Sequence, residues 1–144
     1  MYERVLVPTD GSEGVNYAVE HAVDIANTYR AELHALHVVN VSSLAAETNP
    51  RSVIDEFEDA GEEAVAEVAN RAADAGVEDV TTDVVHGVPH ETILEYIDDA
   101  DIDLVVMGTH GRTGLDRYLL GSLTEKIVRT SDAPVLTVSA PAEE

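Results

Sequence analysis

The 144-residue sequence has no cysteine, no tryptophan, one phenylalanine and, among its eight basic residues, a single lysine, Lys126. Without cysteine the chain can form neither a disulfide framework nor a thiolate metal site, and it has no thiol nucleophile. No apolar run approaches the roughly 18 residues of a membrane-spanning helix. Residues 1–4 lack the layout of a signal peptide, so we expect one soluble, cytoplasmic domain covering residues 1–144, with no membrane partner.

Positive charge is also scarce, because 29 acidic residues stand against 8 basic ones and give a net charge of −21. Such an excess repels phosphate backbones, which argues against nucleic acid as a partner. The acidic surface fits either a halophilic protein, whose salt screens the repulsion, or a surface for a basic partner, and we favour the first. Half of the basic residues gather in segment 108–131, as a site for an anion requires: Arg112, Arg117, Lys126 and Arg129.

Short apolar runs alternate with helical patterns along the chain. The runs predict strands at 5–7, 33–39, 77–86, 103–107 and 135–138. Apolar residues at helical spacing predict a helix capped by Ser12, a long helix from Val53 that ends before Gly76, a helix that opens at Pro89, and a last helix with Leu123 and Ile127 in its apolar stripe. Segment 40–51 has no periodicity and is predicted to be a loop.

This alternation predicts an α/β fold: an open five-stranded parallel sheet in the order 3-2-1-4-5, with helices on both faces, in the Rossmann-like class. The two most continuously apolar runs, 5–7 and 103–107, belong at its centre. Ligands bind such sheets outside the carboxyl ends of the strands, where the strand order reverses. That switch point lies between the first and fourth strands, so segments 8–11 and 108–122 are predicted to meet there.

Segment 108–122 is the part of the chain that most needs a functional explanation. It holds four of the nine glycines and is longer than the 2–6 residues that usually join a strand to a helix. Gly108-x-x-Gly111 can arrange backbone N–H groups around a phosphate, because glycine permits close approach. We therefore interpret it as a phosphate-holding loop, over which Arg112 could close.

Two residues beside this loop have both a structural and a functional interpretation. Ser122 lies where the last helix begins, and the dipole of that helix favours an anion there. Ser122-x-x-Glu125 also matches a capping box. Asp10, before a glycine at a strand end, either stabilises a turn or accepts hydrogen bonds from ribose hydroxyls. The two roles of Ser122 are compatible, because a hydroxyl both donates and accepts.

No histidine is predicted to be catalytic or to bind a metal. His110 lies in the loop and could contact a phosphate, but no nucleophile accompanies it. The other candidates lack the spacing of metal ligands, and we expect structural roles for them: His34, His37, His86 and His90.

Three motifs together resemble the universal stress protein family over essentially the whole chain: Pro8-Thr9-Asp10, Gly108-x2-Gly111-x9-Gly121-Ser122 and Pro134-Val135-Leu136. The glycine spacing is typical of the ATP-binding branch of that family. The resemblance implies ATP as the ligand, with Mg²⁺ possible as its companion. It implies phosphate contacts from Gly108, Gly111, Gly121 and Ser122, ribose contacts from Asp10, and adenine contacts from the backbone around Thr9 and Val38. The remaining candidate contacts are Pro8, His110, Arg112 and Leu123.

The function implied by the resemblance is a stress-response regulator whose nucleotide occupancy alters a dimer or partner surface. The alternative is a weak Mg²⁺-dependent ATPase or phosphotransferase, although no residue is an obvious hydrolytic base. A phosphoacceptor domain is excluded, because the third strand ends in His86-Gly87 and no lysine follows the fifth. A P-loop is excluded because the chain has no Gly-Lys-Ser/Thr.

The edges of the predicted sheet differ in charge. The third strand carries Glu78, Asp79 and Asp83, which would discourage pairing with another chain, whereas the last strand carries no charge. An uncharged apolar edge has free backbone groups and favours pairing with a second copy. We therefore predict a homodimer formed through Val135–Val138, and the resemblance points the same way.

Overall fold

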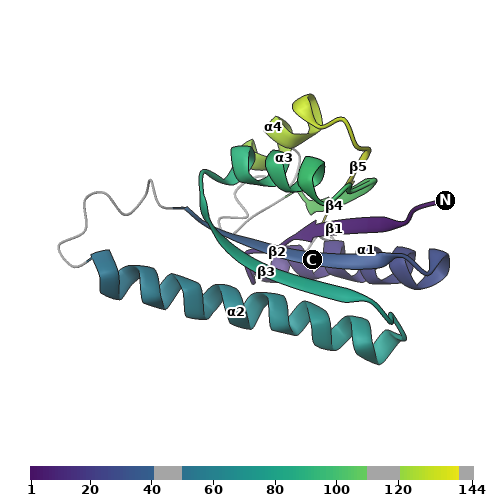
Figure 1. Cartoon of the computed structure of the whole chain (residues 1–144), viewed down its shortest axis with the longest axis horizontal. Helices are drawn as coiled ribbons and strands as arrows, with labels where there is room; N and C mark the ends of the chain where they lie inside the picture. The colour runs from purple at the N-terminus through teal and green to yellow at the C-terminus, as the bar shows by residue number, and fades with distance from the viewer. Residues whose placement is uncertain (41–49, 110–120, 140–144) are drawn as a thin grey trace, which may run out of the picture.

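The computed structural model describes residues 1–40, 50–109 and 121–139, in which strands and helices alternate (Figure 1). The elements are β1 (Arg4–Pro8), a 3-10 turn η1 (Glu13–Val15), α1 (Asn16–Tyr29), β2 (Glu32–Asn40), α2 (Pro50–Ala75), β3 (Val80–Gly87), α3 (Pro89–Asp99), β4 (Leu104–Gly108), α4 (Ser122–Thr130) and β5 (Val135–Val138). No helix in these ranges is both long enough and apolar enough to cross a membrane.

The five strands form one parallel sheet in the order β3-β2-β1-β4-β5, which confirms the predicted topology. β1 is central and pairs with β2 along its whole length, ending with Pro8 opposite Leu36. Its pairing with β4 covers only Val5 and Leu6. Beyond Leu6 the two strands are no longer bridged, so the sheet opens at the predicted switch point.

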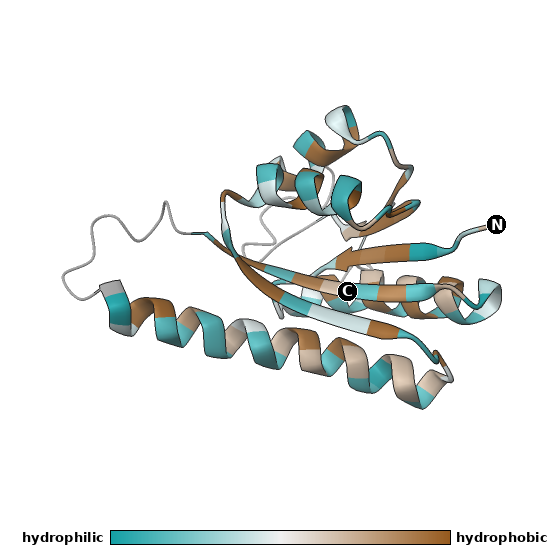
Figure 2. Cartoon of the chain, in the orientation of Figure 1, coloured by the Kyte–Doolittle hydropathy of each residue, from teal (hydrophilic) through white to brown (hydrophobic). Residues whose placement is uncertain are grey.

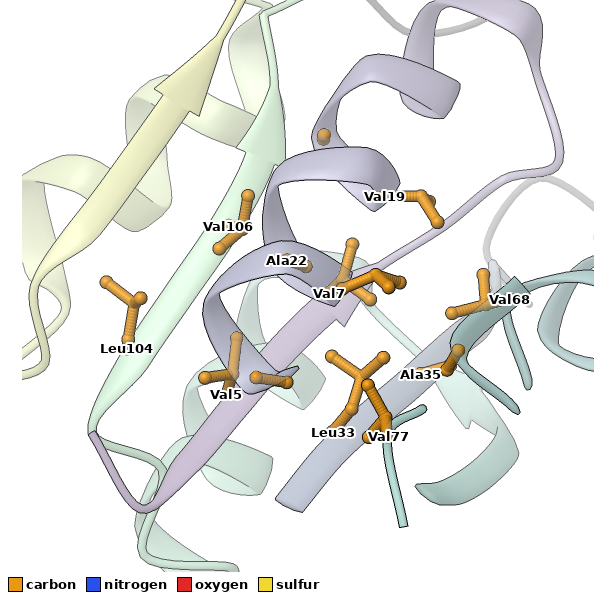
Figure 3. Close-up of a cluster of buried hydrophobic side chains, with 14 of the residues drawn as sticks. Val5, Val7, Val19, Ala22, Leu33, Ala35, Val68, Val77, Leu104 and Val106 are labelled. Atoms are coloured by element: carbon orange, nitrogen blue, oxygen red, sulfur yellow. The ribbon is translucent and has the colours of Figure 1, made fainter. Parts of the chain in front are cut away.

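Alternate residues of the central strands divide the core into two layers. Val5 and Val7 face α1 and α2, in the cluster drawn in Figure 3. Leu6 faces the other side, where it packs with residues of α3 and α4. Figure 1 shows the helix pairs on opposite faces of the sheet, and Figure 2 shows that β1 is mostly hydrophobic while α2 alternates between the two colours. Burying each of these side chains contributes about 1.5–3 kcal/mol, so the centre of the sheet is the most firmly held part of the fold.

Two element boundaries differ clearly from prediction, and at the first of them backbone hydrogen bonds override the apolar pattern. Gly76 adopts φ +99° and Val77 donates its N–H to the Ala72 carbonyl, at 2.9 Å. Val77 is therefore part of the helix end, and β3 begins at Val80 instead of residue 77. At the other end, α2 begins at Pro50, inside the segment predicted to be a loop.

The cap predicted at Ser12 is confirmed in position for η1 but not as a side-chain cap of α1. Ser12 precedes η1 without a side-chain capping bond, α1 begins only at Asn16, and the buried Ser12 hydroxyl has no hydrogen-bond partner among the described residues. The backbone N–H of Ser12 instead donates to Asp10 Oδ1, at 2.9 Å. This residue therefore belongs to the turn that follows β1.

A partly buried polar network fixes α3 on the sheet. The Tyr96 hydroxyl donates to Asp83 Oδ2 at 2.8 Å and lies 2.8 Å from His34 Nδ1, which must be the donor to it. His34 Nε2 lies 3.4 Å from Glu32 Oε2. The carboxylate of Asp83, one of the acidic residues predicted to protect the edge of β3, is thus engaged by α3.

The network makes stability depend on pH through Tyr96, whose pKa is raised above its ordinary value of 10.0 by burial, by the hydrogen bond to Asp83, and by the charges of Asp83 and Glu32. As pH rises above about 10, the unfolded chain loses this proton first, so the free energy of unfolding falls. We expect Tyr96→Phe to unfold about 1 kcal/mol more easily at neutral pH and to decline less steeply above pH 10. Urea titrations across this pH range measure both effects. Tyr17→Phe, at an exposed tyrosine, is the control, and parallel profiles for Tyr96→Phe and wild type would contradict the prediction.

Candidate functional site

A cleft of about 330 Å³ opens at the carboxyl ends of β1, β2 and β4, beside the first turn of α4. The predicted site residues of the described ranges all line it: Pro8, Thr9, Asp10, Val38, Gly108, Gly121, Ser122 and Leu123. Three others lie outside the described residues: His110, Gly111 and Arg112. The structure thus brings residues 8–10 together with the described ends of segment 108–122, while their contacts with a ligand remain a prediction.

The turn after β1 is built by its own side chains. Thr9 Oγ1 accepts the N–H of Gly11 at 3.1 Å, and Asp10 Oδ1 accepts the N–H of Ser12 at 2.9 Å. Gly11 has φ +77°, a conformation that glycine adopts without strain. The structural interpretation of Asp10 is therefore confirmed. The structural role does not exclude the functional one, because a carboxylate can accept more than one hydrogen bond.

β2 extends past the end of β1 and leaves a backbone edge facing the cleft. The last rung between them is the bond from Thr9 N–H to the Leu36 carbonyl, at 2.8 Å. In a regular parallel ladder the next rungs would join Val38 N–H to the Thr9 carbonyl and Gly11 N–H to the Val38 carbonyl. Neither forms in the described part of the chain, because Gly11 donates to Thr9 Oγ1 instead. We call the N–H and C=O of Val38 on this side the open edge of Val38.

The first turn of α4 forms the opposite wall of the cleft. Gly121 is the N-cap, and its N–H donates to the Thr109 carbonyl at 2.8 Å. Thr124 is buried and donates its hydroxyl to the Gly108 carbonyl at 2.8 Å, which ties the helix to the end of β4. The first N–H groups of a helix have no partners within it, so this wall carries partial positive charge.

Ser122 is the first residue of α4 and is exposed, so the predicted capping box with Glu125 is wrong: Gly121 occupies the cap position. Glu125 instead forms an ion pair with Arg129, at 2.7 Å. The Ser122 hydroxyl is thus not used as a helix cap and lies at the rim of the cleft. Of the basic residues that suggest an anion site, the two in the described ranges, Lys126 and Arg129, do not line it.

His37 is a cleft residue that sequence analysis treats only as structural. Its Nδ1 lies 2.8 Å from the Thr9 carbonyl, and the ring is 9% exposed. It packs against Gly61 of α2, where an added Cβ would lie 2.5 Å from His37 Cδ2. A glycine inside a long helix is unfavourable, so Gly61 is the signal in the sequence that a neighbouring ring needs the space.

The family model described as "Universal stress protein family" matches residues 1–139. The chain belongs to the universal stress protein family. The resemblance of the three motifs is confirmed at this level.

Relatives of this universal stress protein cover nearly its whole length. Universal stress protein MJ0531 of Methanocaldococcus jannaschii is 38% identical over 147 residues, covering 100% of this chain and 86% of its own. The solved structure of MJ0577, which is named a universal stress protein of the same organism, matches with a TM-score of 0.87 at 30% identity and covers 99% of both chains. A universal stress protein solved in complex with cAMP matches with a TM-score of 0.71 at 30% identity, covering 96% of this chain and 97% of its own.

Proposed function

We propose that this universal stress protein binds an adenine nucleotide, ATP, in the cleft and acts as a nucleotide-dependent switch in a stress response. The observation that carries the proposal is the pairing of two unlike walls. One wall is the open edge of Val38, and the other is the N-terminus of α4 with the exposed Ser122. A ligand with a flat polar ring at one end and an anion at the other fits both walls.

The open edge of Val38 suits the base. It offers one donor and one acceptor, as adenine requires for its ring nitrogen N1 and its 6-amino group. Pro89 and Ile93 of α3 line the same cleft and supply apolar surface for the ring. Asp10 follows β1, which lies between β2 and β4 in the sheet, and it would accept hydrogen bonds from ribose hydroxyls.

The N-terminus of α4 suits the phosphates. Its free N–H groups and helix dipole favour an anion, and the Ser122 hydroxyl can donate to a phosphate oxygen. From the glycine spacing we also expect Gly108 and Gly111 to contact the phosphates. His110 and Arg112 of the same loop are further candidates for these contacts. Mg²⁺ would be held mainly by the phosphates, because Asp10 is the one carboxylate among the described residues that line the cleft.

A relative supports the choice of an adenine nucleotide. The universal stress protein that was solved with cAMP is 30% identical to this chain over 96% of it. The same ligand class is therefore compatible with this fold at this level of identity.

A direct binding experiment tests the proposal. We expect mass spectrometry of the denatured protein to find a co-purified adenine nucleotide, and calorimetry of the stripped protein to detect binding of ATP in preference to GTP. Absence of both co-purified nucleotide and ATP binding would refute the proposal.

Hydrogen bonds link the phosphate wall to an edge of the sheet, as a switch requires. Gly121 N–H donates to the Thr109 carbonyl at 2.8 Å, and Thr109 N–H donates to the Val138 carbonyl of β5 at 3.0 Å. Binding of a phosphate at the first turn of α4 would thus affect β5, the strand through which we propose that two copies pair.

The alternative function is a weak Mg²⁺-dependent ATPase or phosphotransferase, and a turnover assay distinguishes the two. For a switch, we expect the rate of ADP release to be no higher than the rate at which the bound nucleotide exchanges.

A further inference from the structure

We propose that His37 is a positioning residue that keeps the edge of Val38 open and thereby sets the preference of the cleft for adenine over guanine. The proposal rests on the proposed function and specifies what selects the base. It follows from one contact, which replaces a rung of the sheet by a side-chain hydrogen bond.

The contact joins His37 Nδ1 to the Thr9 carbonyl oxygen, at 2.8 Å. A carbonyl oxygen only accepts, so Nδ1 carries the hydrogen. By the register of β1 and β2, the same oxygen is the one that would accept the N–H of Val38 in the next rung. His37 therefore takes the acceptor that would otherwise close the edge.

The surroundings hold the ring in this position. His37 is buried, and α2 places Gly61 where any Cβ would collide with the ring at 2.5 Å and with Val84 Cγ1 at 3.1 Å. The Thr9 carbonyl is fixed from the other side, because Thr9 N–H still donates to Leu36 at 2.8 Å. A buried ring and a fixed carbonyl make the contact a permanent part of the wall.

The base preference follows from the order of donor and acceptor. Adenine presents an acceptor, N1, next to an amino donor, which matches the N–H and C=O of Val38. Guanine presents the reverse, an N1–H donor next to a carbonyl acceptor. If the Val38 N–H paired with Thr9, only the carbonyl would remain, and it could accept from either base.

Two substitutions separate the hydrogen bond of His37 from its bulk. His37→Asn keeps an N–H donor at the position of Nδ1, whereas His37→Leu removes it. We expect the ratio of the GTP and ATP dissociation constants, measured by calorimetry, to fall about tenfold in His37→Leu and to stay near the wild-type value in His37→Asn. His34→Leu is the matched control, because His34 is buried on the opposite face of the same strand, where it contacts Tyr96 of α3, and it should leave the ratio unchanged.

Amide hydrogen exchange of the nucleotide-free protein gives a readout that needs no ligand. We expect the Val38 amide to exchange rapidly in the wild type and in His37→Asn, and at least about tenfold more slowly in His37→Leu, where the Thr9 carbonyl is released to it. Equal exchange rates in all three proteins would overturn the proposal. So would an unchanged nucleotide ratio in His37→Leu with normal ATP binding, which would leave the proposed function intact. A wild type that binds neither nucleotide refutes the proposed function and, with it, the base preference.

Discussion

Replacing Gly121 by valine is expected to lower the affinity for ATP about a hundredfold, which corresponds to about 2.8 kcal/mol. Gly121 is the N-cap of α4, and a Cβ there would lie 3.2 Å from the Thr109 carbonyl oxygen. A branched side chain would occupy the space through which phosphate oxygens approach the first N–H groups of the helix. Calorimetric titration of the stripped protein with ATP measures the loss.

A matched variant separates blocked binding from a weakened helix. Gly121 has φ −60° and ψ 152°, which any residue adopts, so valine strains no backbone there. Serine at this position is a good N-cap, whereas valine is a poor one. The Cβ of serine has the same 3.2 Å approach to the Thr109 carbonyl oxygen as that of valine. Gly121→Ser should therefore unfold at a higher temperature than Gly121→Val and still bind ATP more weakly than the wild type, since its side chain occupies the same N–H groups. Wild-type affinity in both variants would show that the phosphates lie elsewhere.

The strand order could be predicted because it depends on averages over many residues. The runs 5–7 and 103–107 are apolar without interruption, and that pattern is stable only in strands covered on both faces. Boundaries depend on single hydrogen bonds, which apolar patterns do not encode. Val77 is apolar and buried like a strand residue, yet its N–H closes the end of α2.

Part of the lining of the cleft could be predicted for a different reason. Glycine spacing and the residues after β1 indicate Gly108, Gly121 and Asp10, because short local motifs build turns and helix ends. His37 could not be predicted, since its role arises from a hydrogen bond to Thr9, a residue 28 positions away, and depends on where β1 leaves the sheet. The wrong capping box at Ser122 has a local cause: a one-residue shift of the helix start moves the cap to Gly121.

The homodimer that we predict depends on which backbone groups of β5 face outward. Val105 N–H donates to the Pro134 carbonyl, and Thr109 N–H donates to the Val138 carbonyl. Backbone groups alternate sides along a strand, so Leu136 also faces β4, while the N–H and C=O of Val135 and Thr137 face away from it. β5 is the edge of the sheet, and Leu136 is exposed there. The outward groups can pair with the same strand of a second copy around a twofold axis.

Replacing Thr137 by proline is therefore expected to convert a dimer into a monomer. Proline removes the outward N–H and costs no hydrogen bond to β4, because edge strands tolerate proline where the N–H faces solvent. Light scattering should give twice the chain mass of 15.4 kDa for the wild type and for Thr137→Val, which keeps the N–H and the branched side chain, and the single mass for Thr137→Pro. If ATP occupancy acts on this edge through Thr109, the wild-type dimer dissociation constant should change when ATP is added, and Gly121→Val should abolish that change. A monomeric wild type at all salt concentrations would contradict pairing through β5.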